Sequence, residues 1–214
     1  MLLRSANRPD IMDSGGQVSR FMDNPKELHF QAVKRIICYL KGTSEYGLFY
    51  QRNRGRELVG YTDSDYASDV EDRKSISSYV FMLSEATISW SSKKQPVVSL
   101  STTEAEFIAA TESSCQAVWL RRILETVGRN QINPTVIYCD NSSTIKLSRN
   151  PVLHRRSKHI DVRFHFLREL TRNGTVELLH YSSQEQVADV LTKPLKLEDF
   201  VRMRDKMGVV TNVN

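Results

Sequence analysis

Apolar residues recur along this chain with two different periods, and the change between them divides the chain into two parts. Between residues 24 and 42 they recur every three or four positions, which predicts a helix opened by Asn24 and Pro25 and ended by Gly42. A short strand at 46–50 follows, and the polar stretch 51–56 marks a boundary. Beyond it we predict strands at 58–63, 78–83, 87–92, 135–139 and 175–181, and helices at 101–127, 141–148, 160–171 and 184–191.

Several local patterns make specific predictions about packing. Ile88 and Trp90 alternate with polar residues, which predicts a strand that places both side chains on one face. The run 135–139 is apolar and rich in β-branched residues without such alternation, so we expect a strand buried on both faces. Residues 13–16 include two glycines and are expected to break a helix. The polar residues 196–214 are expected to form a fraying helix or a tail.

Composition and charge narrow the class of protein. The chain has 214 residues, of which 40% are hydrophobic and 26% charged, as in an ordinary globular protein. A net charge of +5 suits a polyanionic partner without requiring one. The three cysteines are far apart, which argues against a structural zinc site. With no apolar run of about 20 residues and no secretory signal, we expect an intracellular protein without a membrane segment, or a fragment of a larger one.

Acidic residues stand at the ends of several predicted elements. Asp63 ends the first strand of the second part, and Asp140 ends the buried strand 135–139. Asp189 lies among apolar residues in the last predicted helix, where it points either at the sheet or into solvent. Each has an ordinary alternative role: Asp63 suits a turn, and Asp140 suits the N-cap of the next helix. The neighbouring Asp65 is read as a solvated or loop-capping residue.

Two further acids, Glu104 and Glu106, lie in the first turn of the long helix. Each stands three residues after a capping hydroxyl, Ser101 or Thr103, so both fit a capping box. Two positions along a helix correspond to about 200° of rotation, so only one of them faces the sheet. The local pattern does not choose between them.

Carboxylates that are brought together repel one another unless cations lie between them. Mg²⁺ favours carboxylate oxygens and keeps several waters, and two such ions about 4 Å apart activate a water for phosphodiester cleavage. The acids therefore suggest a metal-dependent nuclease, provided that they meet in space.

Seven motifs occur in order within residues 57–195, at 60–67, 72–75, 88–95, 101–107, 138–141, 157–161 and 188–193. Together they resemble the C-terminal ribonuclease H domain of copia-type retrotransposon polyproteins. Residues 1–50 resemble the end of the preceding reverse transcriptase region, through the motifs 8–11, 19–22 and 39–43. The paired-aspartate motif of the polymerase is absent, so the resemblance implies a piece of a polyprotein whose upstream polymerase region is missing here. It divides the chain into 1–50, the ribonuclease H-like domain 57–195 and a tail at 196–214.

The resemblance implies an α/β, ribonuclease H-like fold, with a five-stranded mixed sheet flanked by helices and a short helical N-terminal extension. It implies that Asp63, Glu106, Asp140 and Asp189 are catalytic and bind two Mg²⁺ ions, for which Mn²⁺ is a substitute. Glu106 rather than Glu104 matches the family, because Phe107 and Ala109 follow it as the motif requires. The implied activity is endonucleolytic hydrolysis of the RNA strand of an RNA–DNA hybrid, with no small-molecule cofactor.

Polar and basic residues are candidates for binding the hybrid through its phosphates and 2′-hydroxyls. Each of the basic segments also fits an ordinary solvated loop. The candidates are Ser64, Asn141, Ser142, Arg73, Lys74, Lys93, Lys94, Arg155, Arg156 and Lys158.

Two departures from the family pattern leave an alternative open. Many ribonucleases H carry a histidine in the loop before the last acid, whereas this loop, 181–186, has none. Residues 13–16 interrupt an apolar helix, which suggests a decaying or rearranged copy. The alternative function is therefore that of a catalytically inactive or recruited fragment, which binds nucleic acid or acts as an interaction, effector-like protein.

Overall fold

A five-stranded sheet forms the centre of the molecule, in the order β4-β3-β2-β5-β6. The computed structural model describes residues 7–51, 55, 57–149 and 158–211. The strands are β2 Leu58–Ser64, β3 Ile76–Leu83, β4 Ala86–Lys94, β5 Thr135–Cys139 and β6 Val176–His180. Because β2, β3 and β4 are antiparallel whereas β2, β5 and β6 are parallel, the sheet is mixed. The predicted α/β fold class is confirmed, and β5 lies inside the sheet as its β-branched sequence requires.

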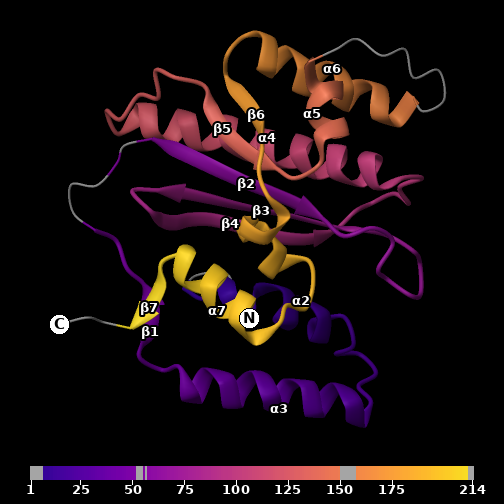
Figure 1. Cartoon of the computed structure of the whole chain (residues 1–214). Coiled ribbons are helices and arrows are strands. Elements are labelled where there is room, and N and C mark those ends of the chain that lie inside the picture. Colours follow the sequence, from indigo (N-terminus) through magenta and orange to yellow (C-terminus); the bar gives the residue numbers. More distant parts are fainter. Residues whose placement is uncertain (1–6, 52–54, 56, 150–157, 212–214) are drawn as a thin grey trace.

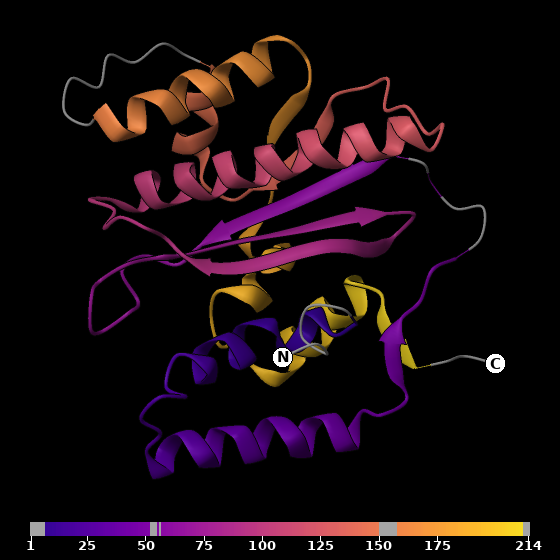
Figure 2. The same ribbon diagram turned by 180° about the vertical axis from the view of Figure 1, so that it is seen from behind.

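The two faces of the sheet are covered by different parts of the chain (Figures 1 and 2). One face carries α4 Thr102–Thr126, with α5 Ser142–Arg149 and α6 Lys158–Arg172. The elements on the other side are η1 Pro9–Ile11, α2 Met12–Ser19, α3 Glu27–Gly42, β1 Tyr46–Leu48, η2 Ser183–Glu185, η3 Val187–Leu191, α7 Leu197–Lys206 and β7 Val209–Thr211. Each face has its own apolar core, one around Phe81 and Phe107 and the other around Val80 and Leu191.

A β-bulge overturns the expectation that Ile88 and Trp90 share a face. In the pairing of β3 with β4, Phe81 lies opposite Ser89, but Met82 lies opposite Thr87. Ile88 is thus the extra residue, and it shifts the alternation by one position. Ile88 packs against the core beneath α4, whereas Trp90 packs against the core on the opposite face.

The N-terminal helices differ from their prediction in two respects. Residues 13–16 do not break a helix, because α2 runs through them and contacts both α3 and β4. Glycine costs about 1 kcal/mol in a helix interior, an amount that tertiary packing commonly outweighs. Helix α3 begins at Glu27, after Lys26 rather than Asn24, and much of its predicted apolar face is exposed, with Leu28 at 71% and Ile37 at 58%.

The C-terminal residues, expected to fray or form a tail, make ordered contacts instead. β7 pairs antiparallel with β1, and Met203 and Met207 are buried in the core that α7 and η3 share. Arg204 stacks over the Tyr46 ring, 4.3 Å from its centroid. The C-terminal segment therefore packs on residues 46–48. The proposed division into three regions stays a prediction.

Near this junction, Arg8 and Asp10 form a buried ion pair at 2.8 Å, to which the Tyr39 hydroxyl adds a hydrogen bond. Among the described residues, no helix has both the length and the apolar character needed to cross a membrane.

Truncating Met207 tests whether the C-terminal segment is part of the core. Met207 is fully buried, so Met207→Ala should lower the free energy of unfolding by about 2–5 kcal/mol in urea denaturation. Leu197→Ala is the matched control, because Leu197 is 77% exposed and its truncation should change stability by about 0.5 kcal/mol or less. Equal, small effects from both substitutions would mean that the segment does not stabilise the fold.

Candidate functional site

Two parallel strands bring the first pair of predicted acids to one edge of the sheet. Asp63 lies near the end of β2, and Asp140 directly follows β5. The two strands pair as far as Tyr61 and Tyr138. Just beyond that pair, the buried Gln186 amide donates to the Thr62 carbonyl at 3.0 Å and to the Tyr138 carbonyl at 3.3 Å. Gln186 thus bridges β2 and β5 at the point where they separate, next to Asp63 and just before Asp140.

The fold assigns different roles to the two glutamates that the sequence pattern could not separate. The Glu106 carboxylate is buried, and its Oε1 accepts a hydrogen bond from the Ser64 backbone N–H at 3.2 Å. Glu104 belongs to a capping arrangement, in which Ser101 Oγ accepts from its backbone N–H and its Oε2 accepts from the Leu100 N–H. Since α4 packs over β2, its inward face carries Glu106 to the sheet edge.

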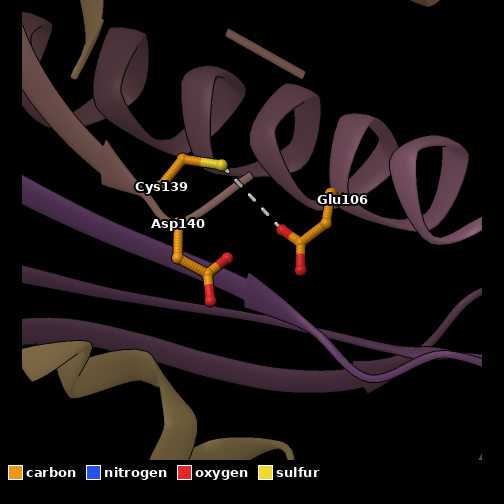
Figure 3. A group of neighbouring side chains, drawn as sticks. All are labelled: Glu106, Cys139 and Asp140. Atoms are coloured by element: carbon orange, nitrogen blue, oxygen red, sulfur yellow. Dashed lines mark hydrogen bonds between the residues drawn. The ribbon is translucent and has the colours of Figure 1, made fainter. Parts of the chain in front are cut away.

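Glu106 and Asp140 point toward one another from α4 and the end of β5, with Cys139 beside them (Figure 3). One ligand atom from each of these three residues lies within 4.8 Å of the others. The Cys139 thiol donates to Glu106 Oε2, with a distance of 4.0 Å between sulfur and oxygen. Asp140 Oδ2 accepts a hydrogen bond from the Ser183 hydroxyl at 2.8 Å.

Asp189 lies on η3, a short 3-10 helix where the sequence predicted a longer helix. Its carboxylate is buried, and its Oδ2 lies 2.9 Å from Lys193 Nζ. The same ammonium lies 3.9 Å from Asp63 Oδ2, which also accepts a hydrogen bond from the Thr192 hydroxyl. Asp189 is therefore directed toward Asp63 and away from solvent.

Burial and the charges of neighbouring acids raise the pKa values of three of the carboxyl groups. Burial raises the pKa of Asp63, and the charge of Asp140 adds to that rise while Lys193 opposes it. Burial also raises the pKa of Glu106 well above its usual range, with further contributions from Asp63 and Asp140. The pKa of Asp189 rises to about 7, first through burial and then through the charge of Asp63. The charges of neighbouring acids thus make it harder for Asp63, Glu106 and Asp189 to ionise.

The donor set suits a hard divalent cation. All four acids offer carboxylate oxygens, the ligands that Mg²⁺ prefers. Asp189 Oδ1 is buried and, among the residues that the structure describes, has no hydrogen-bond partner. A buried oxygen without a partner and a set of mutually repelling carboxylates are both stabilised by a cation between them. Cys139 is a poor ligand by comparison, because burial, followed by the charge of Glu106, raises the pKa of its thiol far above the usual value.

Two of the three polar residues predicted to bind the substrate, Ser64 and Asn141, already form hydrogen bonds within the fold. The Ser64 hydroxyl donates to the backbone carbonyl of Asp65 or Ile76. Asn141 Oδ1 accepts from the Thr144 backbone N–H, which makes Asn141 the N-cap of α5. Ser142 is exposed at the start of that helix.

The predicted basic residues differ in how far their charges are already neutralised. Lys94 pairs with Asp69 at 2.5 Å and with Asp72 at 3.3 Å, and Lys74 lies 3.7 Å from Asp72. Arg73 and Lys93 are exposed. Arg155, Arg156 and the side chain of Lys158 lie outside the described residues.

Sequence reasoning missed several residues that hold the acids in place. An ion pair between Lys193 and Asp189 could have been predicted, because the two residues stand four positions apart. Thr192 is adjacent to it, but a threonine before a lysine carries no signal of its own. Gln186 and Ser183 act through contacts with β2, β5 and Asp140 that no local pattern reveals.

Comparison with known proteins finds close relatives in sequence, although no protein-family model matches the chain. A retrovirus-related Pol polyprotein from transposon TNT 1-94 of Nicotiana tabacum is 44% identical over 205 residues, covering 96% of this chain and 15% of that protein. The secreted RxLR effector protein 161 of Plasmopara viticola is 46% identical over 120 residues, covering 56% of this chain and 84% of that protein. The chain thus spans only about a seventh of the tobacco polyprotein, which it matches almost from end to end of its own length.

Among solved structures, a crystal structure of LC11-RNase H1 in complex with an RNA/DNA hybrid is similar with a TM-score of 0.46 and 11% sequence identity. The alignment covers 64% of this chain and 94% of the other.

The raised carboxyl pKa values predict how the stability of the metal-free protein depends on pH. A carboxyl whose pKa is higher in the folded than in the unfolded chain binds its proton more tightly when folded, so stability is lost as pH rises between the two values. Because the pKa of Asp189 is raised to about 7, we expect the free energy of unfolding to decrease by on the order of 2–4 kcal/mol between pH 5 and pH 8. Urea denaturation in the presence of a chelator measures this.

Asp189→Asn is the control for this pH dependence, because it removes one titrating group and leaves the histidines unchanged. The slope of stability against pH should become shallower in this variant. Stability that stays constant or rises over the same range in the unsubstituted protein would contradict the assignment.

Proposed function

The chain belongs to the copia-type retrotransposon Pol polyproteins, and on this basis we propose that it is a divalent-metal-dependent endonuclease that hydrolyses the RNA strand of RNA–DNA hybrids. One observation carries the proposal: the meeting of four carboxylates at one edge of the sheet. They come from two strand ends, one helix and one 3-10 helix, namely Asp63, Asp140, Glu106 and Asp189. Such costly burial of like charges is typical of a functional site.

The residues of the site divide into cation ligands and residues that orient them. Asp63, Glu106, Asp140 and Asp189 would hold two Mg²⁺ ions, or Mn²⁺ in their place. Ions held there would supply activation of the attacking water and stabilisation of the departing 3′ oxygen. The Ser64 backbone N–H fixes Glu106, and the Ser183 hydroxyl fixes Asp140. The second oxygen of Glu106, Oε2, faces the Cys139 thiol at 4.0 Å.

The hybrid would approach across the sheet edge, where exposed polar and basic side chains flank the acids. Ser142 would contact a ribose 2′-hydroxyl, and Arg73 and Lys93, which are also exposed, would contact phosphates. Lys74 and Lys94 contribute less, because Asp69 and Asp72 already neutralise them. The relatives are much longer Pol polyproteins, so this activity would act on hybrids made by an upstream polymerase region.

Replacing either of two ligands should abolish cleavage while leaving the protein folded. We expect Asp140→Asn and Glu106→Gln each to reduce the rate of hybrid cleavage in Mg²⁺ by at least about a hundredfold. A labelled RNA–DNA hybrid, with duplex DNA as a non-substrate, measures the rate, and circular dichroism checks the fold. Undiminished cleavage by Asp140→Asn would place the activity in another site or in a contaminant.

Glu104→Gln is the matched control for Glu106→Gln, since both change one glutamate in the same helical turn. Gln keeps a side-chain oxygen that can accept the Leu100 N–H as Glu104 does, so the substitution should change stability by about 0.5 kcal/mol or less and leave the cleavage rate within about threefold. A loss as large as that of Glu106→Gln would contradict the assignment of ligand and cap.

The second candidate is a non-cleaving protein that binds nucleic acid or a protein partner. The 46% identity with a Plasmopara viticola protein described as a secreted effector favours this candidate. The hybrid assay separates the two functions: binding of the hybrid without cleavage in Mg²⁺ or Mn²⁺ would support the binding role. Cleavage that requires Asp140 would support the nuclease.

A further inference from the structure

Lys193 contributes a positive charge inside the group of carboxylates. Its Nζ lies 2.9 Å from Asp189 Oδ2 and 3.9 Å from Asp63 Oδ2, and thus bridges acids from η3 and β2. No other Lys or Arg among the described residues forms an ion pair with either acid. Lys193 therefore occupies a position between two of the proposed ligands.

The ammonium group compensates for repulsion that the fold cannot otherwise relieve. The side chains of Asp63 and Asp189 are only 2% and 9% exposed, so water screens their charges poorly. Two unit charges about 4 Å apart interact strongly in such surroundings. A lysine placed between them compensates both negative charges.

The Lys193 ammonium can also move away from the two acids. Its side chain is 41% exposed, in contrast to the acids that it contacts, and it extends on a flexible four-carbon stem. Its backbone stays fixed by the hydrogen bond from its N–H to the Asp189 carbonyl, at 3.1 Å. The charged end can therefore move into solvent without disturbing η3.

We propose that Lys193 is a positioning residue that acts as an internal counter-ion, keeping Asp63 and Asp189 in place before a divalent cation binds and competing with that cation for their oxygens. This inference rests on the proposed metal site and goes further, because it assigns a role to a residue outside the ligand set. It has opposite consequences for two measurable quantities. Removing the charge should destabilise the metal-free protein and strengthen the binding of the metal.

The test compares Lys193→Gln with the unsubstituted protein at one pH and ionic strength. In a chelator, the melting temperature of the variant should fall by about 2–4 °C, because the buried carboxylates lose their compensating charge. By titration calorimetry, the Kd for Mg²⁺ should decrease by about three- to thirtyfold, because the ion no longer displaces an ammonium. If Lys193 had only a structural role, Lys193→Gln would lower the melting temperature without tightening the binding of Mg²⁺.

Two control variants test whether the effect depends on the position of the charge and on the charge itself. Lys196→Gln removes the same charge from an exposed residue of the same segment and should change neither quantity. Lys193→Arg keeps the charge, so its metal-free melting temperature and its Kd should both lie closer to those of the unsubstituted protein than to those of Lys193→Gln.

Several outcomes would overturn the inference. Unchanged or weaker Mg²⁺ binding by Lys193→Gln would exclude competition, and an unchanged metal-free melting temperature would exclude the counter-ion role. If both proteins bind Mg²⁺ with equal affinity, the inference fails alone and the proposed metal site stands. If neither protein binds Mg²⁺ or Mn²⁺, the proposed metal site fails as well.

Discussion

Mutual repulsion among buried carboxylates is the constraint on which the rest of this structure depends. Asp63, Glu106 and Asp189 are all buried, and each has its pKa raised by burial and then by a neighbouring acid. Chains that fold only for stability avoid such an arrangement, because its free-energy cost must be offset elsewhere. The surrounding residues can be understood as the means of holding these charges together.

Two kinds of support meet this requirement. Hydrogen bonds fix individual atoms: Gln186 joins the ends of β2 and β5, and Ser183 and Thr192 each hold one acid. The two apolar cores fix the elements themselves, since α4 lies on one face of the sheet and η3 with α7 lies on the other (Figure 1). The C-terminal helix thus supports the segment that carries Asp189, which explains why residues expected to form a tail are packed instead.

Charge is distributed unevenly around the site. The loop between β2 and β3 carries its own acids, Asp69 and Asp72, which neutralise Lys74 and Lys94. A count of lysines and arginines therefore overstates the basic surface that is available to a polyanion. Arg73 and Lys93 are exposed and form none of these ion pairs. The net charge of +5 is consistent with a nucleic acid partner but does not locate its binding face.

The sequence by itself determined the order of elements, the mixed α/β class and the acids at two strand ends. These features are encoded within short stretches: an apolar run such as 135–139, an acid directly after it, and capping residues before a helix. Local capping logic could not distinguish Glu104 from Glu106, because both satisfy the same rule within one turn. The resemblance to a family did choose Glu106, and the packing of α4 over β2 places that side chain at the sheet edge.

Only the tertiary structure decided which atoms meet. The bulge at Ile88, the helix through residues 13–16 and the packed C-terminal segment all depend on contacts that local periodicity does not contain. Lys193 shows the same point at the site, because its spacing suggests a contact with Asp189 but not with Asp63. The neighbouring Thr192 bonds to Asp63 across 129 positions of the chain. Such pairs form only when the packing of both apolar cores brings distant segments together, so no short stretch of sequence specifies them.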